Sequence, residues 1–171
     1  MKKSINRKGF TLIELLVVVA IIGVLASVVL ASVNSARTKG IDAAVKGNLD
    51  TIRSQAAIYY DDPNNGNGSY NITGNPVTTC NVGMFTDPNI TAAAAAIKLD
   101  AGSLQPNCYA DSAGKSYAVA AVLLTPNAGT FCVDSSGNSK ILSTGNNSSV
   151  TATPNTTNAV LGTDATGYVC Q

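Results

Sequence analysis

The sequence predicts an α+β fold in which one long N-terminal helix packs on a small antiparallel sheet. The residues from Leu15 to Ala36 carry no charge and are mostly apolar. Apolar residues then recur at steps of three and four up to Tyr59, which is the spacing of one helical face. Beyond residue 115 the chain holds short aliphatic runs between turn residues, as antiparallel strands do. These patterns predict a helix first and a sheet after it.

The first helical stretch is long enough to cross a lipid bilayer. As a helix, residues 15–36 extend for roughly 33 Å, which covers a bilayer core. The basic residues before this stretch place the N-terminus in the cytoplasm and the rest of the chain outside. They are Lys2, Lys3, Arg7 and Lys8. An ordinary secretory signal is the alternative, but it leaves Glu14 unexplained, because a carboxylate at membrane depth is costly without a partner.

The second helical stretch has a single apolar face. Its stripe consists of Ile41, Val45, Leu49, Ile52, Ala56 and Tyr59. The helix should end at Asp61-Asp62-Pro63, because proline disfavours helical backbone in the residue before it. We therefore expect one helix from about Phe10 to Tyr60. Its first half would lie in a membrane or a helix bundle, and its second half would pack into the core of a domain.

A loop and a short helix follow. Residues 61–79 contain Asn-Gly and Asn-Pro pairs and are predicted to form a surface loop. Residues 86–102 are predicted to form a short helix, with Asp87 as the N-cap and Pro88 in the first position. Gly102 would stop this helix.

Strands are expected in the last third of the chain. Residues 116–125 form an aliphatic run that predicts a buried strand, and residues 129–142 predict a hairpin that turns at 134–138. The segment from 143 to 167 is too rich in Ser, Thr, Asn and Gly for a core. We expect it to be a loop or an edge strand that Cys170 pins back.

The cysteines predict two disulfides. They are Cys80, Cys108, Cys132 and Cys170, and they contain none of the short-spaced pairs that a structural zinc site needs, so no metal site is expected. An even number at long spacing, after an export-type segment, is typical of disulfides in an oxidising compartment. We favour Cys80–Cys108 with Cys132–Cys170, because each bond then closes and anchors one polar segment of the chain. Nested and crossed pairings remain open.

Composition excludes several functional classes. The chain has no histidine, which removes Ser-His-Asp and Cys-His catalysis and histidine metal sites. The formal net charge is +1, so nucleic-acid binding is not indicated. We predict that the protein is not an enzyme and uses no cofactor.

A basic leader that ends in Gly9, followed by Phe10-Thr11-Leu12-Ile13-Glu14-Leu15-Leu16, resembles the prepilin signal of type IV pilins and type II secretion pseudopilins. In that family a membrane peptidase cuts after the glycine and then N-methylates the new terminus. The resemblance implies cleavage between Gly9 and Phe10 and N-methylation of Phe10. It also implies a leader at 1–9, a transmembrane or filament-core helix at 10–33, and an extracytoplasmic pilin-like globular domain at 34–171.

The resemblance further implies a structural subunit of a type IV pilus-like filament. Its partners would be copies of itself and other pilins, the prepilin peptidase and methyltransferase, a membrane assembly platform, and the lipid bilayer before assembly. The chain would reside in the cytoplasmic membrane with its C-terminal domain outside, and then in an extracellular pilus or a periplasmic pseudopilus. Glu14 would pair with the Phe10 amine of a neighbouring subunit.

Three alternatives compete with a pilus subunit. A type II secretion pseudopilin shares the N-terminus, but the calcium-binding major pseudopilins carry acidic ligands near the C-terminus, where Asp164 stands almost alone here. A non-assembling membrane-anchored surface protein is the second. A secreted hydrolase is the third, and the absence of histidine together with a single glutamate argues against it.

Overall fold

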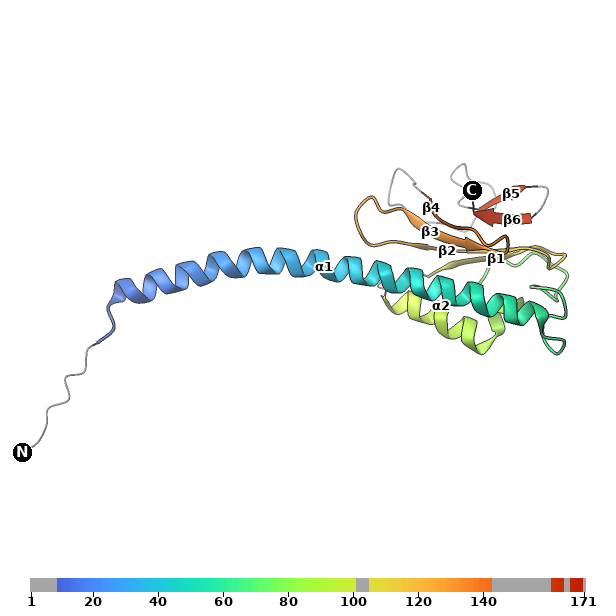
Figure 1. The fold of residues 1–171 in the computed structure, drawn as a ribbon, viewed down its shortest axis with the longest axis horizontal. Helices are drawn as coiled ribbons and strands as arrows, with labels where there is room; N and C mark the ends of the chain where they lie inside the picture. Colours follow the sequence, from blue (N-terminus) through green and yellow to red (C-terminus); the bar gives the residue numbers. More distant parts are fainter. Residues whose placement is uncertain (1–8, 101–104, 143–160, 165–166, 171) are drawn as a thin grey trace, which may run out of the picture. The chain divides into compact units, whose positions relative to one another are not determined.

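The computed structural model of the protein has the α+β architecture that the sequence predicts. It describes residues 9–100, 105–142, 161–164 and 167–170. The chain divides into two compact units, one ending at Arg37 and the other beginning at Thr38. Helix α1 starts in the first unit, and the strands belong to the second (Figure 1).

Helix α1 spans Leu12–Asp61, close to the predicted range from Phe10 to Tyr60. It ends two residues before Pro63, as expected from the restriction that proline places on the preceding residue. Every large aliphatic side chain of α1 from Leu12 to Val33 is exposed. The first unit therefore presents an apolar surface on all sides of the helix.

From Thr38 onward α1 has one buried face, which is the predicted stripe. Ile41 is partly buried, and the fully or almost fully buried members are Val45, Leu49, Ile52, Ala56 and Tyr59. Their side chains join a single apolar core with those of α2 (Pro88–Asp100) and of the sheet. Figure 1 shows this part of α1 together with α2 on one face of the sheet.

The sheet contains four antiparallel strands in the order β1-β2-β3-β4. Their bounds are β1 Asn107–Ala110, β2 Tyr117–Val122, β3 Thr130–Asp134 and β4 Ser139–Leu142. Strand β2 lies inside the predicted strand 116–125, and β3 with β4 forms the predicted hairpin. The sequence does not predict β1, because its four residues are too few to show an alternating pattern.

The two faces of the sheet carry different side chains. Val119 of β2 pairs with Val133 of β3, and both belong to the core under the helices. Ala120 pairs with Cys132 on the opposite face, because cross-strand partners point to the same side and successive residues alternate. We call this opposite face the outer face.

A buried carboxylate fastens α1 to the loop after β2. Asp42 is buried, its Oδ1 accepts a hydrogen bond from the Leu124 amide at 2.6 Å, and its Oδ2 accepts one from the Thr125 amide at 3.0 Å. Hydrogen bonds to an ionised acceptor are stronger than neutral ones. Asp42 therefore fixes the position of the loop on the helix.

Helix α2 begins as predicted. The Oδ1 atom of Asp87 accepts the amides of Asn89 and Ile90, at 2.9 and 3.3 Å, which is N-cap geometry. The predicted stop at Gly102 lies outside the described residues. A short 3₁₀ helix, η1 (Gly83–Thr86), precedes α2.

The predicted surface loop, residues 61–79, is partly built into the fold. Asn71 is buried, and its Nδ2 donates to the carbonyls of Asn75 and Asp111, at 2.6 and 2.8 Å. Val77 is also buried and exchanges two main-chain hydrogen bonds with Ala110 of β1. The expectation of a surface loop is wrong for these two residues. The Asn71 side chain can be buried because its hydrogen bonds are made within the fold, and Val77 is buried where it pairs with β1.

The chain ends in a separate antiparallel pair, β5 (Leu161–Asp164) and β6 (Gly167–Cys170). This hairpin lies on the side of the sheet away from the helices, and β6 is next to β2 and β3 (Figure 1). The other residues of the predicted polar tail, 143–160 and 165–166, lie outside the described residues.

Two disulfides connect these elements. Cys80 is bonded to Cys108 of β1, and Cys132 of β3 is bonded to Cys170 of β6. This is the sequential pairing that we favour from the sequence. The second bond ties the C-terminal strand to the outer face.

A mutation in the helix stripe tests the core. Leu49→Ala removes a fully buried side chain, so we expect it to lower the free energy of unfolding by about 2–5 kcal/mol through lost burial and the remaining cavity. Ile58 on the same helix is 61% exposed, so Ile58→Ala is the matched control and should change stability by less than about 0.5 kcal/mol. Pulse proteolysis of the full-length protein in detergent across a urea series measures both. Equal effects of the two substitutions would contradict the assigned core.

Buried tyrosines make the stability depend on alkaline pH. Burial raises the pKa of Tyr117 well above its usual value, and the nearby Tyr70 and Asp134 raise it further. Burial also raises the pKa of Tyr70 and of Tyr59. The ring of Tyr117 meets that of Tyr70 edge-on, with centroids 4.7 Å apart.

We therefore expect stability to fall as the pH rises above about 10, the ordinary tyrosine value. There the unfolded chain loses phenolic protons that the folded chain keeps, and each such group lowers the free energy of unfolding by up to about 1.4 kcal/mol per pH unit. Pulse proteolysis between about pH 8 and about pH 11 measures this slope. The slope should be shallower in Tyr117→Phe, and an unchanged slope would exclude Tyr117 as a source.

Candidate functional site at the start of helix α1

The Gly9–Phe10 bond lies in exposed, non-helical backbone just before α1. Both residues are exposed, and Phe10 retains 78% of its accessible surface. A Cβ atom added at Gly9 would meet no other atom within 4 Å. Nothing in the described part of the chain therefore covers this bond.

Thr11 and Glu14 form a capping box at the first turn of α1. The Thr11 amide and the Thr11 hydroxyl both donate to Glu14 Oε2, each at 2.9 Å. In return, the Glu14 amide donates to the Thr11 hydroxyl oxygen at 3.2 Å. Thr11 is the N-cap and Glu14 the third helical residue, so the pair satisfies two amides that a helix start leaves without intrahelical partners.

This capping role of Glu14 is not among the roles predicted from the sequence. The signal is nevertheless visible, because Thr11-x-x-Glu14 matches the threonine-to-glutamate spacing of a capping box. The apolar surroundings of Glu14 in the sequence predict only a charge that needs a partner. In the structure its carboxylate is directed toward the N-terminal end of its own helix.

Two serine side chains inside the apolar stretch bond to their own helix. The hydroxyl of Ser27 donates to the Val24 carbonyl at 2.8 Å, and that of Ser32 donates to the Val28 carbonyl at 3.1 Å. Such bonds satisfy the hydroxyl without a second chain. The surface that α1 presents around these serines is therefore apolar.

Helix α1 is also the one candidate membrane span among the described residues, judged by its length and apolar composition. The candidate window is wholly exposed, which distinguishes it from a buried core helix. What supports a membrane role is the combination of this exposed apolar surface with the basic residues before it.

The other predicted site residues lie in the second unit. Cys80, Cys108, Cys132 and Cys170 are all bonded in disulfides, so none is a free thiol. Within the described residues, no three or more His, Cys, Asp or Glu side chains gather in a way that could hold a metal ion.

The start of α1 combines three features. It offers an exposed peptide bond, one carboxylate on the first helical turn, and a long apolar surface behind them. A carboxylate at a helix N-terminus is favourably placed in the field of the helix dipole. The same position would face any cation that sits at the end of the helix.

Comparison with known proteins gives two matches and one absence. Residues 5–30 match the family described as the prokaryotic N-terminal methylation motif. A protein described as "Type IV wide pilus major component PilA4", from Thermus thermophilus, is 33% identical over 127 residues, which are 74% of this chain and 87% of the relative. No solved structure matches the chain. The motif and the extent of the identity lead to one conclusion: the chain belongs to the type IV pilin family.

Proposed function

We propose that this protein is a structural subunit of a type IV pilus-like filament and that it assembles from the membrane through α1. The observation that carries the proposal is the exposed apolar surface from Leu12 to Val33. Burying one large aliphatic side chain contributes roughly 1.5–3 kcal/mol. A surface of this kind needs a lipid bilayer before assembly and a bundle of like helices after it.

We further propose that the chain is processed at its N-terminus. A prepilin peptidase removes residues 1–9 and the new terminus, Phe10, is N-methylated. The exposed Gly9–Phe10 bond and the match to the methylation motif support this step. Residues 10–33 then form the transmembrane or filament-core helix and residues 34–171 the extracytoplasmic domain, a division close to the boundary between the two compact units.

Glu14 supplies a counter-charge for assembly. Cleavage creates a positive amine on Phe10 at the head of an apolar helix, and that amine leaves water when helices pack together. A neighbouring subunit displaced along the bundle presents its Glu14 to this amine. The contacts between Glu14 and Thr11 support the proposal, because they already hold the carboxylate at the helix start.

The relative's description favours a pilus over a secretion pseudopilus, since it is named as a pilus component. The partners that follow are copies of this chain and other pilins, the peptidase and methyltransferase, and a membrane assembly platform. The chain's location is the cytoplasmic membrane and then the filament. Its role is structural, and the peptidase acts on it as a substrate.

Intact-mass spectrometry of protein sheared from cells tests the processing step. We expect the mass of the chain from Phe10 plus one methyl group, because Gly9 gives the peptidase an unhindered backbone. Gly9→Val is the informative variant: the added side chain starts from a Cβ that meets nothing in this chain, so a loss of cleavage arises at the peptidase. Retention of Met1, or cleavage after Ala26 or Ala36, would contradict the filament proposal.

Two substitutions at Glu14 separate its charge from its capping role. Glu14→Gln keeps a capping-box residue but removes the charge, whereas Glu14→Ala removes both. An uncompensated partner in a buried ion pair costs ~3–5 kcal/mol, so both variants should be inserted and cleaved but depleted at least about tenfold from filaments when co-expressed with wild type. Quantitative mass spectrometry of sheared and membrane fractions measures this ratio. Incorporation of Glu14→Gln at the wild-type level would reduce Glu14 to a capping residue.

A further inference from the structure

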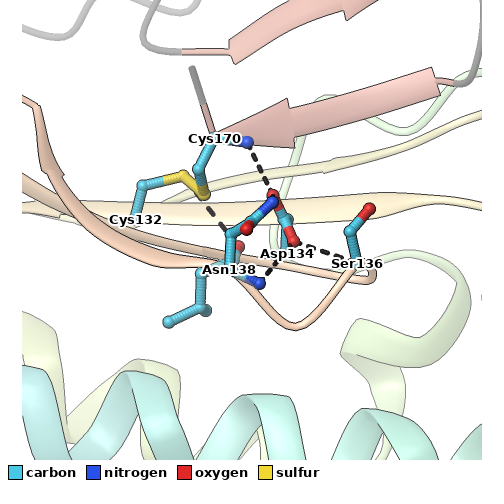
Figure 2. Close-up of a disulfide and its surroundings, with 6 residues drawn as sticks. Cys132, Asp134, Ser136, Asn138 and Cys170 are labelled. Carbon is cyan, nitrogen blue, oxygen red and sulfur yellow. Dashed lines mark hydrogen bonds between the residues drawn. A yellow bond between two sulfur atoms is a disulfide. The ribbon is translucent and has the colours of Figure 1, made fainter.

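Asp134, at the end of β3, is a fully buried carboxylate that binds the β3–β4 turn through both oxygens and the last strand through one of them. Oδ1 accepts the amides of Ser136 and Asn138, at 2.9 and 3.0 Å, and so holds the β3–β4 turn. Oδ2 accepts the Asn138 side-chain amide at 3.1 Å and the main-chain amide of Cys170 at 2.8 Å. Figure 2 shows Asp134 between the turn and the end of β6.

The bond to Cys170 links segments that are far apart in sequence. Cys132 and Asp134 are two residues apart on β3, so both point to the outer face. Cys170 meets both of them: its sulfur is bonded to Cys132, and its amide donates to Asp134. The C-terminal strand is thus held at one residue by a covalent bond and by a hydrogen bond to a carboxylate.

The part of the sheet that lies beneath this strand is lined by small side chains of β2. Ala118 and Ala120 of β2 lie on the outer face and are fully buried, so β6 approaches the sheet over small side chains. Among the described residues, Asp134 has no salt-bridge partner, and its charge is compensated by four N–H donors. Removing an acceptor that is buried among donors is costly, because the donors lose their partner.

We propose that Asp134 docks the C-terminal strand: its Oδ2 binds the Cys170 amide and delivers the Cys170 sulfur to Cys132 before their disulfide forms. Asp134 is then a positioning residue for this cross-link, and it keeps β6 in place when the disulfide is reduced. The proposal does not depend on the filament function.

The chemistry of the cross-link is thiol–disulfide exchange with an external disulfide such as oxidised glutathione. One cysteine thiolate attacks the oxidised glutathione, a mixed disulfide forms, and one glutathione thiolate leaves. The second cysteine thiolate then attacks the protein sulfur of the mixed disulfide, the Cys132–Cys170 bond forms, and the second glutathione thiolate leaves. The two thiols give up two electrons and two protons, and the glutathione disulfide takes both electrons.

Asp134→Asn is the informative variant. With its one oxygen toward the turn, the asparagine still accepts the amides of Ser136 and Asn138. Its NH₂ group then faces the Cys170 amide, and two donors cannot form a hydrogen bond with each other. The side chain of Asn138 can rotate to accept from that NH₂ group. The turn is therefore kept and the contact with Cys170 is lost.

The chain offers a matched control at the β1–β2 turn. Asp111 Oδ1 accepts the amides of Lys115 and Ser116, at 2.7 and 3.1 Å, as Asp134 Oδ1 does in its own turn. Both turns also contain a glycine at positive φ, Gly114 and Gly137. Asp111→Asn therefore perturbs a similar turn without touching Cys170.

The experiment follows reoxidation of the full-length protein in detergent. The reduced protein is mixed with oxidised glutathione, quenched with a maleimide at intervals, and mapped by peptide mass spectrometry. In Asp134→Asn we expect Cys132–Cys170 to form at least about tenfold more slowly than in wild type, because a charge-assisted hydrogen bond is lost. Cys80–Cys108 should keep its rate, and Asp111→Asn should keep both rates. Wild-type rates in Asp134→Asn, or equal slowing in both variants, would overturn the proposal.

Hydrogen exchange on the reduced wild type gives a second test that needs no variant. The peptide containing Cys170 should remain protected after the disulfide is reduced under native conditions. If this peptide exchanges at the rate of an unstructured chain, alone or together with the rest of the sheet, Asp134 does not hold the strand and the proposal fails. This measurement decides the matter even if Asp134→Asn fails to accumulate.

Discussion

The residues of helix α1 suit two different surroundings, an apolar one before Thr38 and a domain core after it, and the rest of the fold follows from that constraint. Up to Val33 its large aliphatic side chains are all exposed, whereas from Val45 onward one apolar stripe is buried in the core. The change of pattern fixes where the sheet can attach. Asp42 lies at this change and is the first buried residue of the helix. Because its carboxylate binds the loop after β2, it also fixes the position of the sheet along the helix axis.

The long helix could be predicted because its evidence is local and repeated. A stripe with steps of three and four fixes its face, and Pro63 fixes its end. Strand β1 could not be predicted, since its four residues gain their structure from pairing with β2. The same holds for Asp134: its place in a turn is readable from the hairpin pattern, but no sequence signal connects it with Cys170, which lies 36 positions away.

In the described part of the chain, acidic side chains accept hydrogen bonds from N–H groups more often than they form ion pairs with cations. Glu14 accepts the Thr11 amide, Asp42 accepts two loop amides, and Asp134 accepts amides from a turn and from the last strand. Asp42 and Asp134 each bind two or more main-chain amides, whereas Glu14 binds one main-chain amide and one hydroxyl, both from Thr11. The resemblance to the prepilin signal implies an assembly role for Glu14, and the local geometry around Glu14 is that of a helix cap.

The position of Asn71 in the fold makes a modification motif in the sequence inaccessible. Asn71-Ile72-Thr73 has the form of an N-glycosylation acceptor, which is expected on an accessible loop. Here the nitrogen that would receive the sugar is buried and donates to two main-chain carbonyls, while the Asn71 Oδ1 accepts from Thr73. Attaching a glycan would break the contacts that seat this loop beside β1. In the folded chain the triplet is therefore closed to glycosyl transfer, and only a chain that has not yet folded could be modified there.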